Sequence, residues 1–142
     1  MKAAFVYNFM LFTDWPTLPN NTLQICTMES DQLKRELEQY TKNQPHGAKL
    51  VITKISHLAE IKECQALFLS EEDRQRIPTI LPSVEGSPVL TVTDVQGLVG
   101  KGAIIGMSIK NRHIIFEVDS ITAKKSGLHL SSKLLNLAKT VY

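Results

Sequence analysis

The sequence has no apolar run long enough to cross a membrane and no long block of basic residues. Its longest apolar run is at the start, where ten of the first twelve residues are apolar, whereas a membrane helix needs about 20. The 16 basic and 14 acidic residues leave a net charge of +2, and at most two Lys or Arg residues are adjacent. We therefore expect no membrane span and no nucleic acid as the main partner.

Cysteine is scarce, since Cys26 and Cys64 are the only two. Neither belongs to a Cys-x-x-Cys pair or has histidines at zinc-ligand spacing, which argues against a metal site. The residues alone leave two interpretations open, a disulfide or two buried thiols, because a buried cysteine packs as a small hydrophobe without a partner.

Motifs for nucleophilic catalysis are also missing. There is no Gly-x-Ser-x-Gly, no Ser-x-x-Lys and no cysteine flanked by glycine. Of the four histidines, His46 falls in a predicted turn, His57 near a helix start and His113 in a predicted hairpin, so we expect surface or structural roles for these three. We expect no enzyme, no catalytic residue and no cofactor.

What is present suffices for one hydrophobic core. The chain has 142 residues, of which 43% are hydrophobic, and a mean hydropathy of -0.05. Because domains usually have about 100 to 150 residues, we expect a single domain over residues 1–142.

Hydrophobic periodicity predicts alternating helices and strands in the first two thirds of the chain. A helix over 2–13 would bury Phe5, Phe9 and Phe12. A strand over 23–28 follows, and then a helix over 31–43 that Ser30 caps and an Asp31–Arg35 pair supports, up to a stop at Pro45–Gly47. The next elements are a strand over 49–55, a helical segment over 56–61 and a strand over 64–69. Ser70–Asp73 then opens a helix that Pro78 and Pro82 interrupt, and a strand over 89–93 comes last. Such alternation indicates parallel strands with helical crossovers.

The pattern changes after residue 93. Segments 103–109 and 113–118 flank Lys110–Arg112 and predict an antiparallel hairpin. A short helix from Ser120 and a final helix over 131–142 follow, the latter with Leu134, Leu137, Ala138 and Val141 facing inward. We therefore expect an α/β domain with a mixed sheet of about five to six strands, a parallel N-terminal part plus a C-terminal antiparallel hairpin, flanked by helices.

A signal peptide is the alternative interpretation of the first apolar segment, with Lys2 as its charged region. Thr13–Pro16 is a poor cleavage site, however, which favours a folded amphipathic helix. Any signal of the precursor would then lie upstream of this helix and have been removed.

Two glycine-bearing segments are candidate anion sites. Gly97–Gly102 is neither a GxGxxG nor a Walker loop, and a strand follows it where a helix N-terminus is needed, so we expect it to serve as a turn. The second candidate is stronger: His129, Ser131 and Lys133 surround a predicted helix start, where free N–H groups favour an anionic ligand. The simpler alternative is that Ser131 is only a helix cap.

Four segments together resemble the YfiR family. They are Lys2–Phe9 (KAAFVYNF) with the following Phe12 and Trp15-Pro16, Cys64–Leu69 (CQALFL), Val89–Asp94 (VLTVTD) and Ser126–Leu135 (SGLHLSSKLL). None of them is catalytic, and the specificity comes from their combination and spacing over almost the whole chain.

The resemblance implies a periplasmic, non-enzymatic regulator exported by a signal peptide. Such a protein would sequester the periplasmic sensor domain of a membrane diguanylate cyclase of the YfiN type, and so lower cyclic-di-GMP and biofilm formation. It also implies a homodimer and a disulfide between Cys26 and Cys64, since an oxidising periplasm favours the bond.

By position, the resemblance also assigns site residues. Phe116, Glu117, Asp119 and Lys124 would form an apolar, charge-rimmed surface for the cyclase. A small anionic or aromatic ligand held by His129, Ser131 and Lys133 would tune that contact.

Two other function classes remain to be weighed. A stand-alone periplasmic small-molecule receptor, with its site near His129, is the main alternative. A receiver-like signalling domain is suggested by Met28–Asp31 after the first strand, but the third strand ends in Leu69-Ser70 and offers no phospho-acceptor.

If Ser131 caps the last helix, Ser131→Ala should lower the free energy of unfolding by about 0.5 to 2 kcal/mol. The measurement is a thermal melt followed by circular dichroism. A melt indistinguishable from that of the unmodified protein would contradict the cap.

Overall fold

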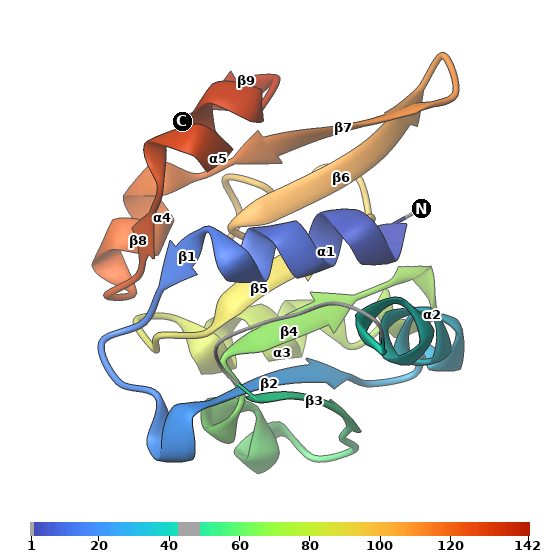
Figure 1. Ribbon diagram of the computed structural model, residues 1–142, viewed down its shortest axis with the longest axis vertical. Helices are drawn as coiled ribbons and strands as arrows, with labels where there is room; N and C mark the ends of the chain where they lie inside the picture. Colours follow the sequence, from blue (N-terminus) through green and yellow to red (C-terminus); the bar gives the residue numbers. More distant parts are fainter. Residues whose placement is uncertain (1, 43–48) are drawn as a thin grey trace.

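A mixed sheet of seven strands runs through the computed structural model, which describes residues 2–42 and 49–142 (Figure 1). The strands lie in the order β3-β2-β4-β5-β6-β7-β9. Their bounds are β2 (Thr22–Thr27), β3 (Lys49–Lys54), β4 (Ala66–Leu69), β5 (Leu90–Thr93), β6 (Ile105–Lys110), β7 (His113–Val118) and β9 (Thr140–Val141). The predicted stop at Pro45–Gly47, with His46, lies outside the described residues.

The predicted fold class is confirmed. Strands β3, β2, β4, β5 and β6 pair in parallel, and β6 and β7 form an antiparallel hairpin. The hairpin turn consists of Asn111 and Arg112, with φ of 51° and 66°. Two successive positive φ values match the right-handed twist of the strands, which is why a two-residue turn suffices here.

Helices cover both faces of the sheet (Figure 1). One core cluster contains residues of α1 (Lys2–Leu11), α2 (Asp31–Thr41), α4 (Ser120–Lys125) and α5 (Ser132–Leu137). The other contains residues of the 3-10 segment η2 (Leu58–Glu63) and of α3 (Ile77–Val84). In β4, Ala66 and Phe68 belong to the first cluster and Leu67 and Leu69 to the second, because successive strand residues face opposite sides.

Helix α1 packs its aromatic face on the C-terminal hairpin. Phe9 is 1% exposed, and its ring lies 4.9 Å from that of Phe116 in an edge-to-face contact. Phe5 contacts both rings, at 6.3 and 6.4 Å. Of the predicted buried stripe, Phe9 is fully buried, whereas Phe5 and Phe12 are only partly buried.

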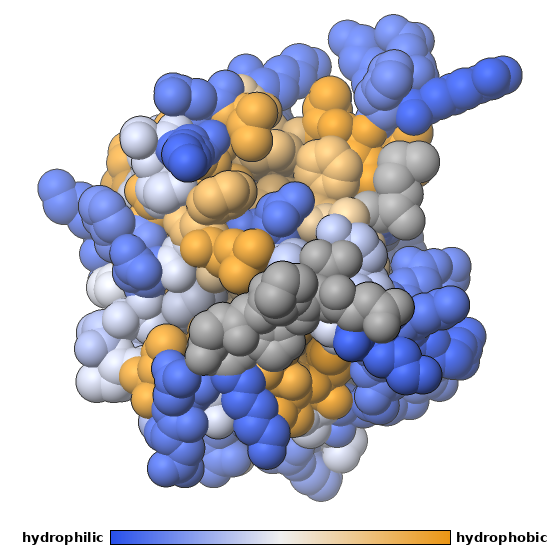
Figure 2. Space-filling view, viewed as in Figure 1, coloured by the Kyte–Doolittle hydropathy of each residue, from blue (hydrophilic) through white to orange (hydrophobic). Residues whose placement is uncertain are grey.

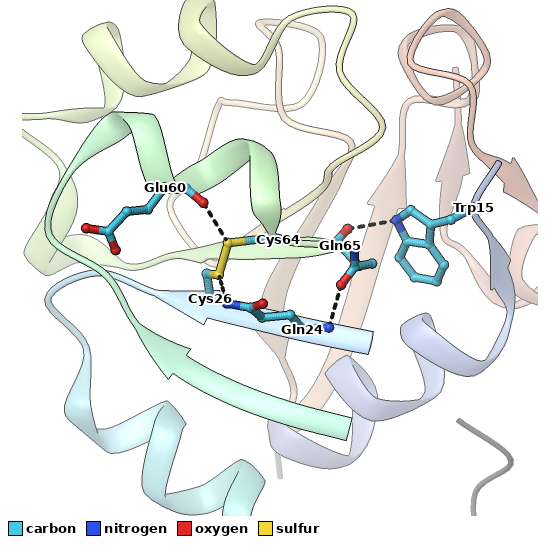
Figure 3. The surroundings of a disulfide bond; sticks show 6 residues. All are labelled: Trp15, Gln24, Cys26, Glu60, Cys64 and Gln65. Atoms are coloured by element: carbon cyan, nitrogen blue, oxygen red, sulfur yellow. Dashed lines mark hydrogen bonds between the residues drawn. A yellow bond between two sulfur atoms is a disulfide. The ribbon is translucent and has the colours of Figure 1, made fainter. Parts of the chain in front are cut away.

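Cys26 and Cys64 form a disulfide, with their Cα atoms 6.0 Å apart (Figure 3). Both cysteines are buried in the second core cluster, on the face of the sheet opposite α1. The bond closes a chain segment of 38 residues, for which loop entropy predicts a stabilisation of about 4 kcal/mol. The pairing that the resemblance implied is therefore present.

The start of β4 is tied to β2 and to the segment after α1. The Trp15 indole donates to the Gln65 carbonyl at 2.8 Å, and the Gln65 side chain accepts from the Gln24 backbone N–H at 2.7 Å (Figure 3). These hydrogen bonds fix the segment that leads from α1 into the sheet.

The final helix is shorter than predicted. Helix α5 ends at Leu137, and Thr140–Val141 becomes the edge strand β9. There, the Lys139 N–H donates to the Phe116 carbonyl and the Tyr142 N–H to the Val118 carbonyl, both at 2.8 Å. The open edge of β7 thus competes for this segment, and the sheet has more strands than the five to six expected. Leu137 and Val141, predicted to face inward, are exposed.

Two further local predictions were wrong. Helix α1 ends at Leu11, and Thr13–Asp14 (β1) pairs instead with His129–Leu130 (β8). Pro78 and Pro82 lie within α3 rather than interrupting a helix, and Pro78 stands at its start, where no intrahelical N–H bond is needed.

The ion pair expected within α2 also differs. Lys54 of β3, not Arg35, donates to the Asp31 carboxylate at 2.9 Å. This hydrogen bond and the charge of Lys54 lower the pKa of Asp31. A tertiary contact therefore replaces the local pair.

Phe9→Ala should destabilise the protein by about 3 to 5 kcal/mol, because it empties a fully packed site between α1 and β7. Phe12→Ala, at a partly buried position of the same segment, should cost less. Urea unfolding of both variants checks the prediction, and equal stability of Phe9→Ala and the unmodified protein would contradict it.

Candidate functional site

An apolar groove of about 490 Å³ lies between α1, β7 and α5. Its lining residues are Phe5, Asn8, Phe9, Phe12, Ile114, Ile115, Phe116, Leu134, Leu137 and Lys139. Figure 2 shows hydrophobic residues gathered over the upper half of this face, with hydrophilic side chains around them. The volume falls in the range of sites for small ligands or for side chains of a partner.

Each wall of the groove is apolar for a local reason. In α1, Phe5 and Phe12 flank the buried Phe9, so their rings line the groove instead of entering the core. In α5, Leu134 is buried, but Leu137 is 70% exposed because the helix ends at this residue. The apolar surface continues along the hairpin, where Ile109 is 65% exposed and pairs with Ile114. Large apolar side chains so exposed indicate an interaction surface.

The predicted ligand residues lie at the end of this groove and do not line it. His129, in β8, is exposed and pairs in register with Asp14. Ser131 is the N-cap of α5, as predicted, and its hydroxyl accepts from the Leu134 N–H at 3.3 Å. Lys133 is exposed in the first turn of α5. A ligand role for the three residues stays a prediction.

The hydrogen bond from the Ser131 N–H to the Phe12 carbonyl, at 2.9 Å, holds the start of α5 against the end of α1. Together with the β1–β8 pairing, it sets the spacing between two walls of the groove.

The predicted partner residues separate into buried and exposed ones. Phe116 lines the groove while packing in the core. Asp119 is buried as the N-cap of α4, where its carboxylate accepts from the Thr122 N–H at 2.9 Å and the Thr122 hydroxyl at 2.7 Å. Lys124 is exposed on α4. No contact among the described residues tests their predicted partner role.

Glu117 has a structural partner at the chain end. Its carboxylate accepts from the Tyr142 hydroxyl at 3.3 Å. The negative charge of Glu117, followed by desolvation and this hydrogen bond, raises the pKa of Tyr142. Glu117 therefore helps to hold the last residue beside β7, next to the edge strand β9.

Of the groove residues, sequence reasoning assigned only Phe116 to a binding surface. It missed Asn8, Ile115 and Lys139, and it placed Leu137 on a buried face. Hydrophobic periodicity assigns the apolar residues of a helix to the core, and it does not indicate that the last helix ends before the predicted residue. The only available signal was the β-branched pair Thr140-Val141 near the end, which favours a strand over a helix.

The site offers binding rather than covalent chemistry. The groove contributes one amide, Asn8, and one cation, Lys139, among apolar side chains. In residues 2–42 and 49–142, no three His, Cys, Asp or Glu side chains are grouped to hold a metal ion, and no helix is long and apolar enough to cross a membrane.

Comparison with protein families finds a match over nearly the whole chain. The model of a family described as YfiR/HmsC-like matches residues 1–139. A search of curated proteins found no match.

Two solved structures share the fold. A conserved domain protein from Vibrio cholerae O1 biovar eltor superposes with a TM-score of 0.67 at 12% identity, covering 99% of this chain and 60% of that one. The ABC domain in complex with L-Trp from Streptococcus pneumoniae has a TM-score of 0.62 at 12% identity, covering 84% of this chain and 55% of that one. This chain therefore spans less than two thirds of either protein, and the likeness concerns the fold alone.

Glu117→Gln should lower the pKa of Tyr142 towards the ordinary tyrosine value, because removing the carboxylate charge removes the repulsion of the phenolate. A pH titration of the tyrosine ring carbons by NMR measures this shift. Glu72→Gln, at an exposed carboxylate of another segment, should leave the pKa of Tyr142 unchanged. An unaltered Tyr142 titration in Glu117→Gln would refute the contact.

Proposed function

Because the chain belongs to the YfiR/HmsC-like family, we propose that it uses the apolar groove to sequester the periplasmic sensor domain of a membrane diguanylate cyclase. The family is regulatory and non-enzymatic, and its members act in the periplasm on diguanylate cyclases. Sequestration would hold the cyclase inactive and so lower cyclic-di-GMP and biofilm formation.

The observation that carries the proposal is the exposed apolar surface itself. Leu137 at the groove and Ile109 beyond it are large side chains left largely in contact with water. Covering them with a partner removes apolar area from water, which is the dominant favourable term in most protein association. The partly buried aromatic side chains of Phe5 and Phe12 line the groove next to these positions, and aromatic residues are enriched among those that contribute most of the binding energy.

Charged residues around the groove would orient the partner. Lys139 lines the groove, and Glu117 lies beside Phe116 on β7. We propose that Phe116, Glu117, Asp119 and Lys124 belong to the contact, with Phe116 and Asp119 acting mainly by fixing the surface. Charge placed at a rim affects orientation and the rate of association more than the affinity. We also propose that the protein is a homodimer, and that it binds the sensor domain in this form.

A stand-alone small-molecule receptor is the second candidate. The size of the groove favours it, since about 490 Å³ suits an aromatic molecule. In that case, His129, Ser131 and Lys133 at the groove end would bind the anionic group of the ligand.

Calorimetric titration of the protein with the sensor domain of a cyclase encoded next to it tests the proposal, in the absence of added ligand. Saturable binding is the expected result. Repeating the titration with reductant tests whether the Cys26–Cys64 bond contributes. Absence of binding under both conditions would favour the receptor.

Leu137→Ser should weaken binding of the sensor domain about tenfold or more, because it removes the most exposed large apolar side chain of the groove. The matched control is Leu11→Ser at the end of α1, which removes a side chain that is 48% exposed but neither lines the groove nor belongs to the proposed contact residues. The same calorimetric titration measures both. Equal losses of affinity in the two variants would rule out the groove as the binding surface.

A further inference from the structure

A second cavity, of about 340 Å³, lies at the amino ends of β5 and β6. Its walls come from α3, the loop before β6 and the end of α4. Leu81, Val84, Val89 and Ile104 form the apolar part of its lining. None of these residues lines the groove between α1, β7 and α5, so the two sites are separate.

Two lysines from different segments meet at this cavity. Lys101 comes from the loop before β6 and Lys125 from the last turn of α4. Among the described residues, neither side chain has an ion-pair partner. Two lysine ammonium groups without ion-pair partners at one cavity favour the binding of an anionic group there.

Ser126 supplies a free hydroxyl at the same place. The residue is only 6% exposed and lines the cavity, while its backbone N–H closes the end of α4. Within residues 2–42 and 49–142 its hydroxyl has no hydrogen-bond partner, in contrast to the neighbouring Thr91, whose hydroxyl accepts from the Ile104 N–H at 2.9 Å. The hydroxyl oxygen itself is not buried but open to the cavity, where it is available to donate to a bound group.

The loop that carries Lys101 is the glycine-bearing segment 97–102. As expected from the sequence, it forms a turn that leads into the strand β6. Gly102 has a φ of 119°, and a Cβ there would lie 3.3 Å from the Leu81 Cβ. The glycine thus lets the loop turn close to α3, with Lys101 and Gly102 both lining the cavity.

We infer that this cavity binds a small organic anion, a carboxylate or phosphate monoester with a compact apolar body. The anionic group lies between Lys101 and Lys125 and accepts a hydrogen bond from the Ser126 hydroxyl. The apolar body packs on Leu81 and Val89. Glu85, at the same cavity, disfavours densely charged polyanions by repulsion.

Titrations of the ¹⁵N-labelled protein followed by NMR test the inference, with phenyl phosphate, benzoate, inorganic phosphate and benzyl alcohol as probes. Saturable shifts of the Gly102 and Ser126 amides are expected with phenyl phosphate or benzoate, and whichever binds more tightly identifies the anionic group. Benzyl alcohol should give no saturable shift. Inorganic phosphate should bind more weakly than phenyl phosphate, because it lacks the apolar body.

Lys101→Gln and Lys125→Gln should each weaken the binding of the better probe about tenfold, and Ser126→Ala should weaken it less. Lys110→Gln, at an exposed lysine of the hairpin away from the cavity, is the matched control and should not alter it.

Three results would overturn the inference. They are the absence of saturable shifts at the cavity, shifts confined to the groove residues, and an affinity retained in both lysine variants. Should a variant fail to fold, the shift map of the unmodified protein still decides between these outcomes. The readout does not involve a cyclase, so it stands or falls separately from the proposed sequestration.

Discussion

The edge-to-face contact between Phe9 and Phe116 joins the first helix to the C-terminal hairpin, and the groove depends on it. Phe9 comes from α1 and Phe116 from β7, so the two walls that these elements provide are held together by residues from opposite ends of the chain. Because the rings are fully desolvated, their contact adds to the burial of a large apolar area.

The third wall is fixed by backbone hydrogen bonds rather than by packing. The short β1–β8 pair and the Ser131–Phe12 bond attach the start of α5 to the end of α1. On the other side, β9 pairs with β7 and pulls the chain out of the helix after Leu137. Leu137 is left exposed because the open edge of β7 is satisfied by the residues that would have continued α5. The exposed apolar surface is thus a consequence of completing the sheet.

The parallel half of the sheet is stabilised differently. The Cys26–Cys64 bond joins β2 to the start of β4 on the face away from α1, and the hydrogen bonds of Gln65 join the same place to β2 and to the segment after α1. The second cavity lies among α3, α4 and the glycine-bearing loop, off the groove. Beside the surface proposed to contact the cyclase, the protein therefore has a second, chemically different site at which a small anion is proposed to bind.

The sequence predicted most elements that depend on local patterns. Ser30, Ser131 and the hairpin turn act through neighbours a few residues away, so their roles follow from short segments. The parallel direction of the strands follows equally from their alternation with helices, whereas their order in the sheet does not. Asp31 shows the limit, because its partner Lys54 lies on another element and no local pattern identifies it.

By itself, the sequence determined the α/β class, the helix caps, the hairpin and the apolar residues that fill the core, since these follow from periodicity and capping chemistry. Only the tertiary structure decided that the chain ends in a strand, that Leu137 is exposed at a groove, and that Lys101 and Lys125 share a cavity. The physical reason is that each of these outcomes depends on competition or proximity between segments far apart in the chain. The pairing of a sheet edge and the meeting of two lysines at one cavity each involve two distant segments, so neither outcome can be predicted from the sequence of one segment alone.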